Sequence, residues 1–232
     1  RQRQMCIRDR ISIAQGTGTT VSIQITRVGR GSSQQDAQSA LNDIAVDATQ
    51  QASTINVTTN FTEGGGILNN VREVDLVILT PHATQLQVDD TSGTVDVSRI
   101  SGQMQLSVTS GNAATTGPLG GQVETHGVVF GAGSSVQVTY GTISLEGALA
   151  PGASLDVQLD AGDVTLALPA NTPAQLSATV DSGSISVTGW PITPTHPTDN
   201  TSGTTASGSL GTKPRGSVAV HVSAGSITLV AE

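Results

Sequence analysis

Aromatic side chains and cysteine are nearly missing from this sequence. Phe, Trp and Tyr make up 2% of the 232 residues, charged residues make up 12%, and Cys6 is the single cysteine. One cysteine excludes an internal disulfide framework. Glycine and small residues dominate instead, and β-branched residues alternate with polar ones along much of the chain. This composition argues against disorder and predicts thin β-layers built from small side chains.

Positive charge is also scarce. Ten Lys and Arg residues stand against 18 Asp and Glu residues, which gives a net charge of −8, and Lys213 is the only lysine. A chain this acidic is a poor partner for nucleic acid or for an anionic membrane surface. No apolar run approaches the roughly 20 residues that a membrane-spanning helix needs. We therefore expect no nucleic-acid partner and no spanning helix in this sequence.

Residues 1–10, RQRQMCIRDR, differ in composition from everything that follows, because they hold four of the ten basic residues and Cys6. Their Met-Cys-Ile-Arg-Asp-Arg sequence resembles the translation of a sequencing adapter. We interpret the segment as an artefact and begin the domain at Ile11; a natural basic arm is the alternative. Without it, six basic residues (10 − 4) stand against 17 acids (18 − 1), a net charge of −11. We expect the natural N-terminus, with any signal peptide or membrane anchor, to lie upstream.

The dominant pattern in the sequence is a repeat of about 21 residues, and a fixed period of this size indicates stacked repeats. In each copy, a small residue followed by glycine lies between two sets of alternating apolar residues. The copy at Gly162 returns one period later at Gly183 and two further periods later at Gly225. The copies centre on Gly93, Gly111, Gly141, Gly162, Gly183 and Gly225. The double gap before Gly225 predicts that one period's length of chain is looped out there.

Each copy predicts a strand, a tight bend and a second strand. The apolar residues alternate on both sides of the glycine, which is typical of strands with one buried face. In the copy around Gly162 they are Leu155, Val157, Leu159, Val164, Leu166 and Leu168. Glycine adopts positive φ without steric cost, so the structural bend glycines are Gly93, Gly162, Gly183 and Gly225.

Two assemblies of such units are compatible with the pattern. If the bend folds the strand back on itself, the chain forms an antiparallel β-sandwich. If the bend turns a corner, each strand pairs with its counterpart one period later and the chain forms a parallel β-solenoid. The constant spacing favours the solenoid, because only there do equivalent residues stack. We predict a single all-β domain over residues 11–232, with turns of about 21 residues.

Two segments depart from the β pattern. Residues 33–44 have apolar residues at helical spacing, and Ser33 with Asp36 forms a capping box, which predicts one short N-terminal helix. Residues 189–214 are rich in Pro, Thr and Ser and contain Trp190, the only tryptophan. Because loops that leave a solenoid often carry recognition, Trp190 is a candidate binding residue. The interpretation we prefer is that its ring covers an apolar edge of the stack.

The assembled chain resembles the bacterial DUF4097 family of adhesin-like proteins. The resemblance covers Ile11 to the C-terminus and rests on Ser/Ala-Gly-x-Val/Ile-x-Leu/Val steps and on the segment that follows Leu168-Pro169. The residues that carry it are Gly93, Gly162, Gly183, Gly225, Ala174, Leu176 and Ala178. It implies a β-solenoid-like domain at or outside the cell envelope, and it brings no catalytic residues with it.

Patterns for catalysis or tight metal binding are missing from the sequence. The four histidines, His82, His126, His196 and His221, are scattered and have no cysteine partners. No G-x-S-x-G segment is present. We therefore expect no catalytic residue and no cofactor.

One column of acidic residues follows from the period. Asp160 is expected above Asp181, with Asp163 near the same corner, and two carboxylates stacked this way would repel by about 1 kcal/mol in water. A weak Ca²⁺ site at Asp160, Asp163 and Asp181 is conceivable on that basis. Aspartates that form turns are the interpretation we prefer, and the same holds for Asp89 and Asp90.

Three hypotheses of function follow. The preferred one is a non-catalytic domain of the bacterial envelope or exterior, with an adhesin-like binding or structural role toward an unidentified surface glycan or protein. The second is a polysaccharide-active β-helix enzyme, which would need Asp160, Asp163 and Asp181 in one groove with Arg or Lys. The third is a scaffold that assembles end to end through open sheet edges.

Overall fold

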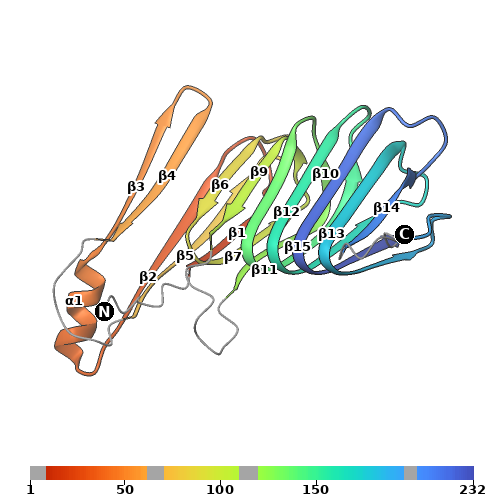
Figure 1. The fold of residues 1–232 in the computed structure, drawn as a ribbon. Helices are drawn as coiled ribbons and strands as arrows, with labels where there is room; N and C mark the ends of the chain where they lie inside the picture. Colours follow the sequence, from red (N-terminus) through yellow and green to blue (C-terminus); the bar gives the residue numbers. More distant parts are fainter. Residues whose placement is uncertain (1–8, 62–70, 110–119, 196–202) are drawn as a thin grey trace.

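The computed structural model describes residues 9–61, 71–109, 120–195 and 203–232. Nearly all of this part of the chain is β-structure, arranged as a 13-stranded sheet and a separate two-stranded sheet, with one helix (Figure 1). The main sheet is mostly parallel. Its strands stack side by side along the length of the molecule (Figure 1). The all-β prediction is confirmed.

Four long strands of similar length form the regular part of the sheet. They are β11 (Ser134–Leu149), β12 (Ser154–Leu168), β13 (Ala174–Thr188) and β15 (Gly216–Ala231). We call each of them a rung, because each consists of two halves joined by a bend at a glycine of positive φ. Equivalent residues pair in parallel, as Gly141 does with Gly162 one period later. The prediction that the repeats pair in parallel is thus confirmed, and the alternative prediction of an antiparallel β-sandwich is wrong.

The order of the rungs differs from the order predicted. The last rung, β15, lies between β12 and β13, so that Gly225 pairs with both Gly162 and Gly183. The expectation that Gly162 and Gly183 are direct neighbours is therefore wrong. The physical reason is that β12 and β13 carry apolar residues at the same inward positions and glycine at the same bend, so β15 fits between them in the register that both share.

The halves of the rungs line up into two walls. The first wall contains β6 (Leu86–Asp90), β9 (Met104–Val108), the first halves of the rungs and β14 (Thr204–Ser209). The second wall contains β7 (Gly93–Ser98), β10 (Gly121–Phe130) and the second halves. The short β8 (Ser101–Gly102) pairs with β10.

The hydrophobic core lies between the two walls. Alternate residues of each rung point inward, and Val157 and Leu159 of the first half and Val164 and Leu166 of the second are at most 1% exposed. They join one apolar cluster that runs from Ile13 to Leu229. Because each rung is buried only against its neighbours, the core depends on the whole stack.

The second wall extends beyond the first at the N-terminal end. Its strands continue from β7 to β1 (Asp9–Gln15), then β5 (Val71–Thr80), and end at β2 (Ser22–Arg30), which pairs antiparallel with β5. Although β1 comes first in the sequence, it lies inside the sheet between β5 and β7. Asp9 and Arg10, which the sequence assigned to the foreign segment, belong to β1.

Helix α1 (Gln34–Asn42) confirms the helix prediction. The Ser33 hydroxyl accepts a hydrogen bond from the Asp36 backbone N–H at 3.1 Å, as a capping residue does. The helix packs mainly against β2 and leads into a hairpin of β3 (Ile44–Gln51) and β4 (Thr54–Phe61). This hairpin is the two-stranded sheet, and it stands away from the regular stack (Figure 1).

Two interactions hold the base of the hairpin to the main sheet. Arg72 of β5, 3% exposed, forms an ion pair with Asp43 at 2.6 Å, and Arg27 of β2 donates to the Ile44 carbonyl at 3.0 Å. Val74 and Leu76 of β5 pack against Ile44 in a second, smaller apolar cluster. The hairpin is therefore fixed over the N-terminal extension of the second wall.

The excursion at 189–214 forms an end cap. Trp190 is 7% exposed and belongs to the core cluster, and its indole N–H donates to the Ala170 carbonyl at 3.2 Å. β14 then pairs antiparallel with the first half of β13 and becomes the edge of the first wall. Residues 196–202 of the excursion and the glycines at 64–66 and 111 lie outside the described residues. In the part of the chain that is described, no helix is long and apolar enough to cross a membrane.

Candidate functional site

The aspartates predicted to stack do not meet. Leu159 and Val180 both pair with Val222 of the inserted rung, which places Ser223 between Asp160 and Asp181. The two carboxylates are thus two strand spacings apart, about 9.5 Å, and the predicted contact between them is wrong. Asp160 and Asp181 are separated because β15 occupies the position next to β12, where the repeat predicted β13.

Asp163 and Asp181 have separate partners on the outer surface. The Ser226 hydroxyl donates to Asp163 at 2.5 Å, and His221 Nε2 lies 3.5 Å from an Asp181 carboxylate oxygen. Among the described residues, no three His, Cys, Asp or Glu side chains gather in a way that could hold a metal ion. Asp160 and Asp163 of β12 and Asp181 of β13 are therefore exposed residues of two rungs that are not neighbours.

The remaining histidines also lie apart on the surface. His82 Nδ1 is 2.8 Å from the Arg99 carbonyl, and His126 Nδ1 is 3.2 Å from the Glu146 carboxylate. His196 lies outside the described residues. Each of the described histidines is exposed and has its own partner, so they do not form a common site.

A groove of about 1140 Å³ opens at the N-terminal end of the stack. One side is β4 of the hairpin, the other is β6 at the end of the first wall, and the floor is the inner face of β1, β5 and β2. The floor is apolar, with Ile11, Leu76 and Ile78 among its residues. In the part of the chain that the structure describes, the second wall continues past β6 while the first wall does not, and the groove lies over this extension.

Asp90 lies at the end of β6 and is the most unusual polar group of this groove. It is 8% exposed; one carboxylate oxygen accepts from the Ser92 N–H at 3.3 Å, as in an aspartate turn, and the other oxygen has no hydrogen-bond partner. Burial raises the pKa of this carboxyl, while hydrogen bonds from the Ser92 and Thr91 backbone act in the opposite direction. A buried acceptor without a donor is costly and indicates a missing contact.

Asp9 is the second partly buried carboxylate that lines the groove. It accepts a hydrogen bond from the Val74 N–H at 3.0 Å. Burial raises its pKa to about 6, the Val74 bond lowers it, and repulsion from Asp90, Glu73 and Asp75 raises it further. Sequence analysis missed this residue because it excluded residues 1–10, and it missed the groove because no periodic signal marks where the first wall ends.

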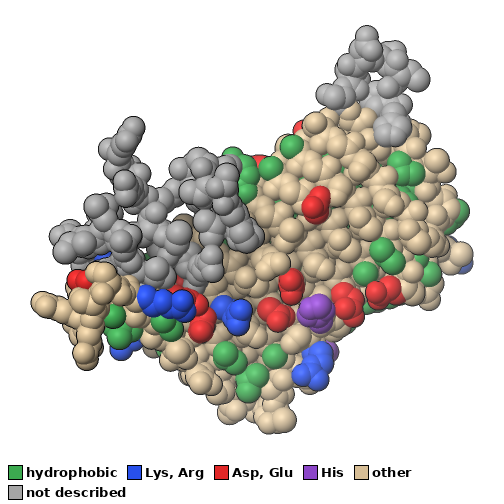
Figure 2. Space-filling model, turned by 90° about the horizontal axis from the view of Figure 1, so that it is seen from below, with side chains coloured by type: hydrophobic (Ala, Val, Ile, Leu, Met, Phe, Trp, Pro, Cys, Tyr) green, Lys and Arg blue, Asp and Glu red, His purple; other side chains and the backbone are tan. Residues whose placement is uncertain are grey.

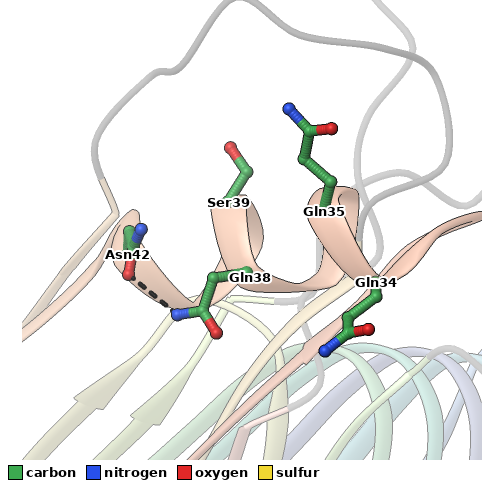
Figure 3. Close-up of a pocket in the computed structure, with 5 residues that line it drawn as sticks. All are labelled: Gln34, Gln35, Gln38, Ser39 and Asn42. Carbon is green, nitrogen blue, oxygen red and sulfur yellow. Dashed lines mark hydrogen bonds between the residues drawn. The ribbon is translucent and has the colours of Figure 1, made fainter.

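A second, smaller hollow of about 590 Å³ lies along α1. Its five lining residues are all uncharged and polar, and Figure 3 shows that all come from the helix itself. Gln38 donates to the Asn42 side-chain carbonyl at 3.1 Å. Since no other element among the described residues contributes a side chain, we interpret this hollow as the polar outer face of the helix.

The outer faces of the walls are polar and regular. On the second wall, Thr165 pairs with Thr228, and Thr228 pairs with Ser186, so short hydroxyl side chains repeat from rung to rung. Figure 2 shows a face on which uncharged polar surface predominates and charged side chains gather in a band. Such surfaces offer many hydrogen-bonding groups and little charge.

The comparison with family models agrees with the resemblance seen in the sequence, and one solved structure is also similar. A crystal structure of a protein described as a "putative cell adhesion protein" from Clostridium sporogenes ATCC 15579 is similar to this chain, with a TM-score of 0.44 and 11% sequence identity. The match covers 97% of this chain and 89% of that one. No curated protein matches the chain significantly. The family model described as Toastrack DUF4097 matches residues 70–229. This range covers more than half of the chain and includes the four rungs except for the last two residues of β15, and the chain therefore belongs to the DUF4097 (Toastrack) family.

Proposed function

We propose that this protein is a non-catalytic domain of the bacterial cell envelope or cell surface, with an adhesin-like role in binding or structural support. The observation that carries this proposal is the stacked β-architecture of this chain, which belongs to the DUF4097 family. A stack of parallel rungs presents two long walls of hydroxyl and amide side chains, and stacked-repeat proteins use such extended faces for binding. The ligand would be a surface glycan or protein.

We further infer that the rungs form one parallel β-solenoid with turns of about 21 residues. Paired positions of β11 and β12 are offset by one period, as Gly141 and Gly162 are, which supports this inference. The column of corner glycines, Gly141, Gly162, Gly225 and Gly183, supports it as well. A solenoid would explain why both halves of each rung contribute to one core.

No specific observation favours the polysaccharide-active alternative. The carboxylates on which it depended, Asp160, Asp163 and Asp181, are exposed, and Asp181 belongs to a rung that β15 separates from the rung of the other two. The groove that does exist has only acidic residues as its charged lining among the described residues.

The binding role can be tested with an array of glycans and matrix proteins. The intact chain should bind specific members of the array, and a variant with Thr165→Lys and Ser186→Lys on the outer second wall should lose part of that binding. Asp47→Asn, on the exposed side of the hairpin, serves as a control. Absence of binding to every member would contradict the binding role.

The location can be tested separately in cells that express the natural gene. We expect the protein in the envelope fraction and accessible to protease added outside intact cells. A product found only in the cytosolic fraction would contradict the envelope proposal without affecting the array result.

A further inference from the structure

We propose that the groove between β4 and β6 accepts an extended strand of a partner protein, with alternating apolar and basic residues. This inference deepens the proposed binding function, on which it rests, by naming a site and the chemistry of its partner.

The first edge is that of β6. The Leu86 N–H donates to the Gln103 carbonyl, and the Asp90 carbonyl accepts from the Thr109 N–H, so these residues direct their backbone groups toward β9. Backbone groups alternate in direction along a strand, which turns those of Gln87 and Asp89 to the opposite side. Within the described residues β6 pairs with β9 alone. The N–H and carbonyl groups of Gln87 and Asp89 thus face the groove.

The second edge is that of β4. It pairs with β3 on one side, and the residues from Ser53 to Phe61 line the groove on the other. β3 contributes no residue to the lining. The two edges therefore face each other across the groove, and unpaired strand edges of this kind accept added strands through main-chain hydrogen bonds.

The floor selects for apolar side chains on one face of the added strand. Ile11 of β1 and Ile78 of β5 point into the groove and are only partly buried. In the regular stack, the first half of each rung covers the inner face of the second half. Within the described residues the first wall ends at β6, so β1 and β5 have no such cover beyond the hairpin. An inserted strand would supply it. The five residues of β6 correspond to a partner segment of about 17 Å.

The charge of the groove selects for basic residues. Asp9, Asp89 and Asp90 line it, and no Lys or Arg is found among its described lining residues. The buried Asp90 oxygen without a hydrogen-bond donor lies at the end of β6. A Lys or Arg of the partner would provide that donor, and a charged hydrogen bond of this kind is stronger than a neutral one.

The proposal can be tested with a fluorescein-labelled peptide of sequence Thr-Val-Lys-Val-Lys-Val-Thr. We expect saturable binding to the intact chain, measured by fluorescence anisotropy. A peptide with Glu in place of both Lys should bind at least about tenfold more weakly, because its charge opposes the aspartates. A peptide with Pro in place of the central Val should not bind, because proline removes a main-chain donor.

Variants of the protein locate the site. Asp89→Pro removes the N–H that faces the groove and should abolish binding, while Ser207→Pro, on the edge strand β14 at the other end, should leave it unchanged. Asp90→Asn should weaken binding of the Lys peptide several-fold, and Asp47→Asn should not. If Asp89→Pro is poorly folded by circular dichroism, hydrogen exchange on the unmodified chain decides: the amides of Gln87 and Asp89 should become protected when the peptide is added.

Several results would overturn the inference. They are equal binding of the Lys and Glu peptides, no binding of either peptide, and full binding by a folded Asp89→Pro variant. If the chain forms a dimer and Asp89→Pro abolishes that dimer, the groove receives a second copy of the chain. This result would also overturn the choice of partner. Array binding that survives in Asp89→Pro would leave the proposed function standing while the groove is excluded.

Discussion

At the scale of single residues, the corner glycines determine how closely the rungs approach. Gly162 has φ of +137°, and a Cβ built there would overlap the carbonyl oxygen of Gly141 in the next rung. Gly225 meets Gly162 in the same way. The small residue and glycine that define the repeat therefore reflect a stacking requirement as well as a bend. The sequence allowed the bend to be predicted, but the contact depends on which rungs are neighbours.

The first prediction concerns this corner. Gly162→Ala should lower the free energy of unfolding by about 3 kcal/mol or more, because it combines unfavourable φ with a backbone overlap. Gly152→Ala is the matched control: its φ is +77°, and a Cβ there meets no atom within 4 Å. It should cost only about 1 to 2 kcal/mol for the backbone conformation. Urea unfolding of both variants measures the difference, and equal losses would show that the overlap is relieved by movement.

The second prediction concerns the pH dependence of stability. Burial is the main reason that the pKa of Asp9 rises from 3.8 to about 6. The folded protein then holds this proton more tightly than the unfolded chain does, so the contribution of Asp9 to stability is full below pH 3.8 and is lost as the pH rises through 6. Asp9→Asn removes this titration and should stabilise the protein at pH 7 by about 1 kcal/mol, a figure reduced for solvent screening.

The gain from Asp9→Asn should disappear near pH 4, where the wild-type carboxyl is protonated in the folded state. Thermal unfolding at both pH values provides the measurement. Asp47→Asn, at an exposed position of β3, is the control and should show no such difference. A gain of equal size at both pH values would contradict the assignment, since it would come from packing and not from ionisation.

At the scale of elements, the sequence predicted what each segment forms better than where it lies. The alternation around Gly162 identified both halves of a rung, and Ser33 with Asp36 identified the start of α1. The placement of β1 could not be predicted, because its Ile11 and Ile13 fit the inner face of any second-wall position. Its pairing with both β5 and β7 depends on residues far away in the sequence.

Trp190 supports the third prediction, which concerns the end cap. The ring is 7% exposed against the core, so Trp190→Ala should destabilise the protein by about 3 to 5 kcal/mol. Trp190→Phe retains most of the apolar contact but loses the hydrogen bond to the Ala170 carbonyl, and it should cost about 1 kcal/mol. Chemical denaturation followed by circular dichroism measures both. A negligible effect of Trp190→Ala would mean that the ring serves a purpose other than covering the edge.

At the scale of the whole molecule, the repeat could not predict the order of the rungs in the sheet. A period measures separation along the chain, and it predicts neighbours only when successive copies stack in sequence. That holds for β11 and β12 but fails for β13, because the chain after β13 first forms the cap and then returns as β15 between β12 and β13. The predicted aspartate column was lost for this reason.

The cap also bears on assembly, and the fourth prediction follows from it. β14 covers the open edge of β13 in the first wall, where Ala206 pairs with Ala178. Thr205 exchanges hydrogen bonds with Thr195 on the outer side, so the backbone groups of Ala206 face β13 and those of Ser207 face outward.

Ala206→Pro should therefore detach β14 and expose the β13 edge to other copies. Ser207→Pro should retain the pairing, because proline is tolerated where its missing N–H faces solvent. Light scattering across a concentration series should show a constant monomer mass for the intact chain and for Ser207→Pro, and a mass that grows with concentration for Ala206→Pro. If the mass of the intact chain also grows with concentration, the result would instead support the end-to-end scaffold, because assembly would then proceed with the cap in place.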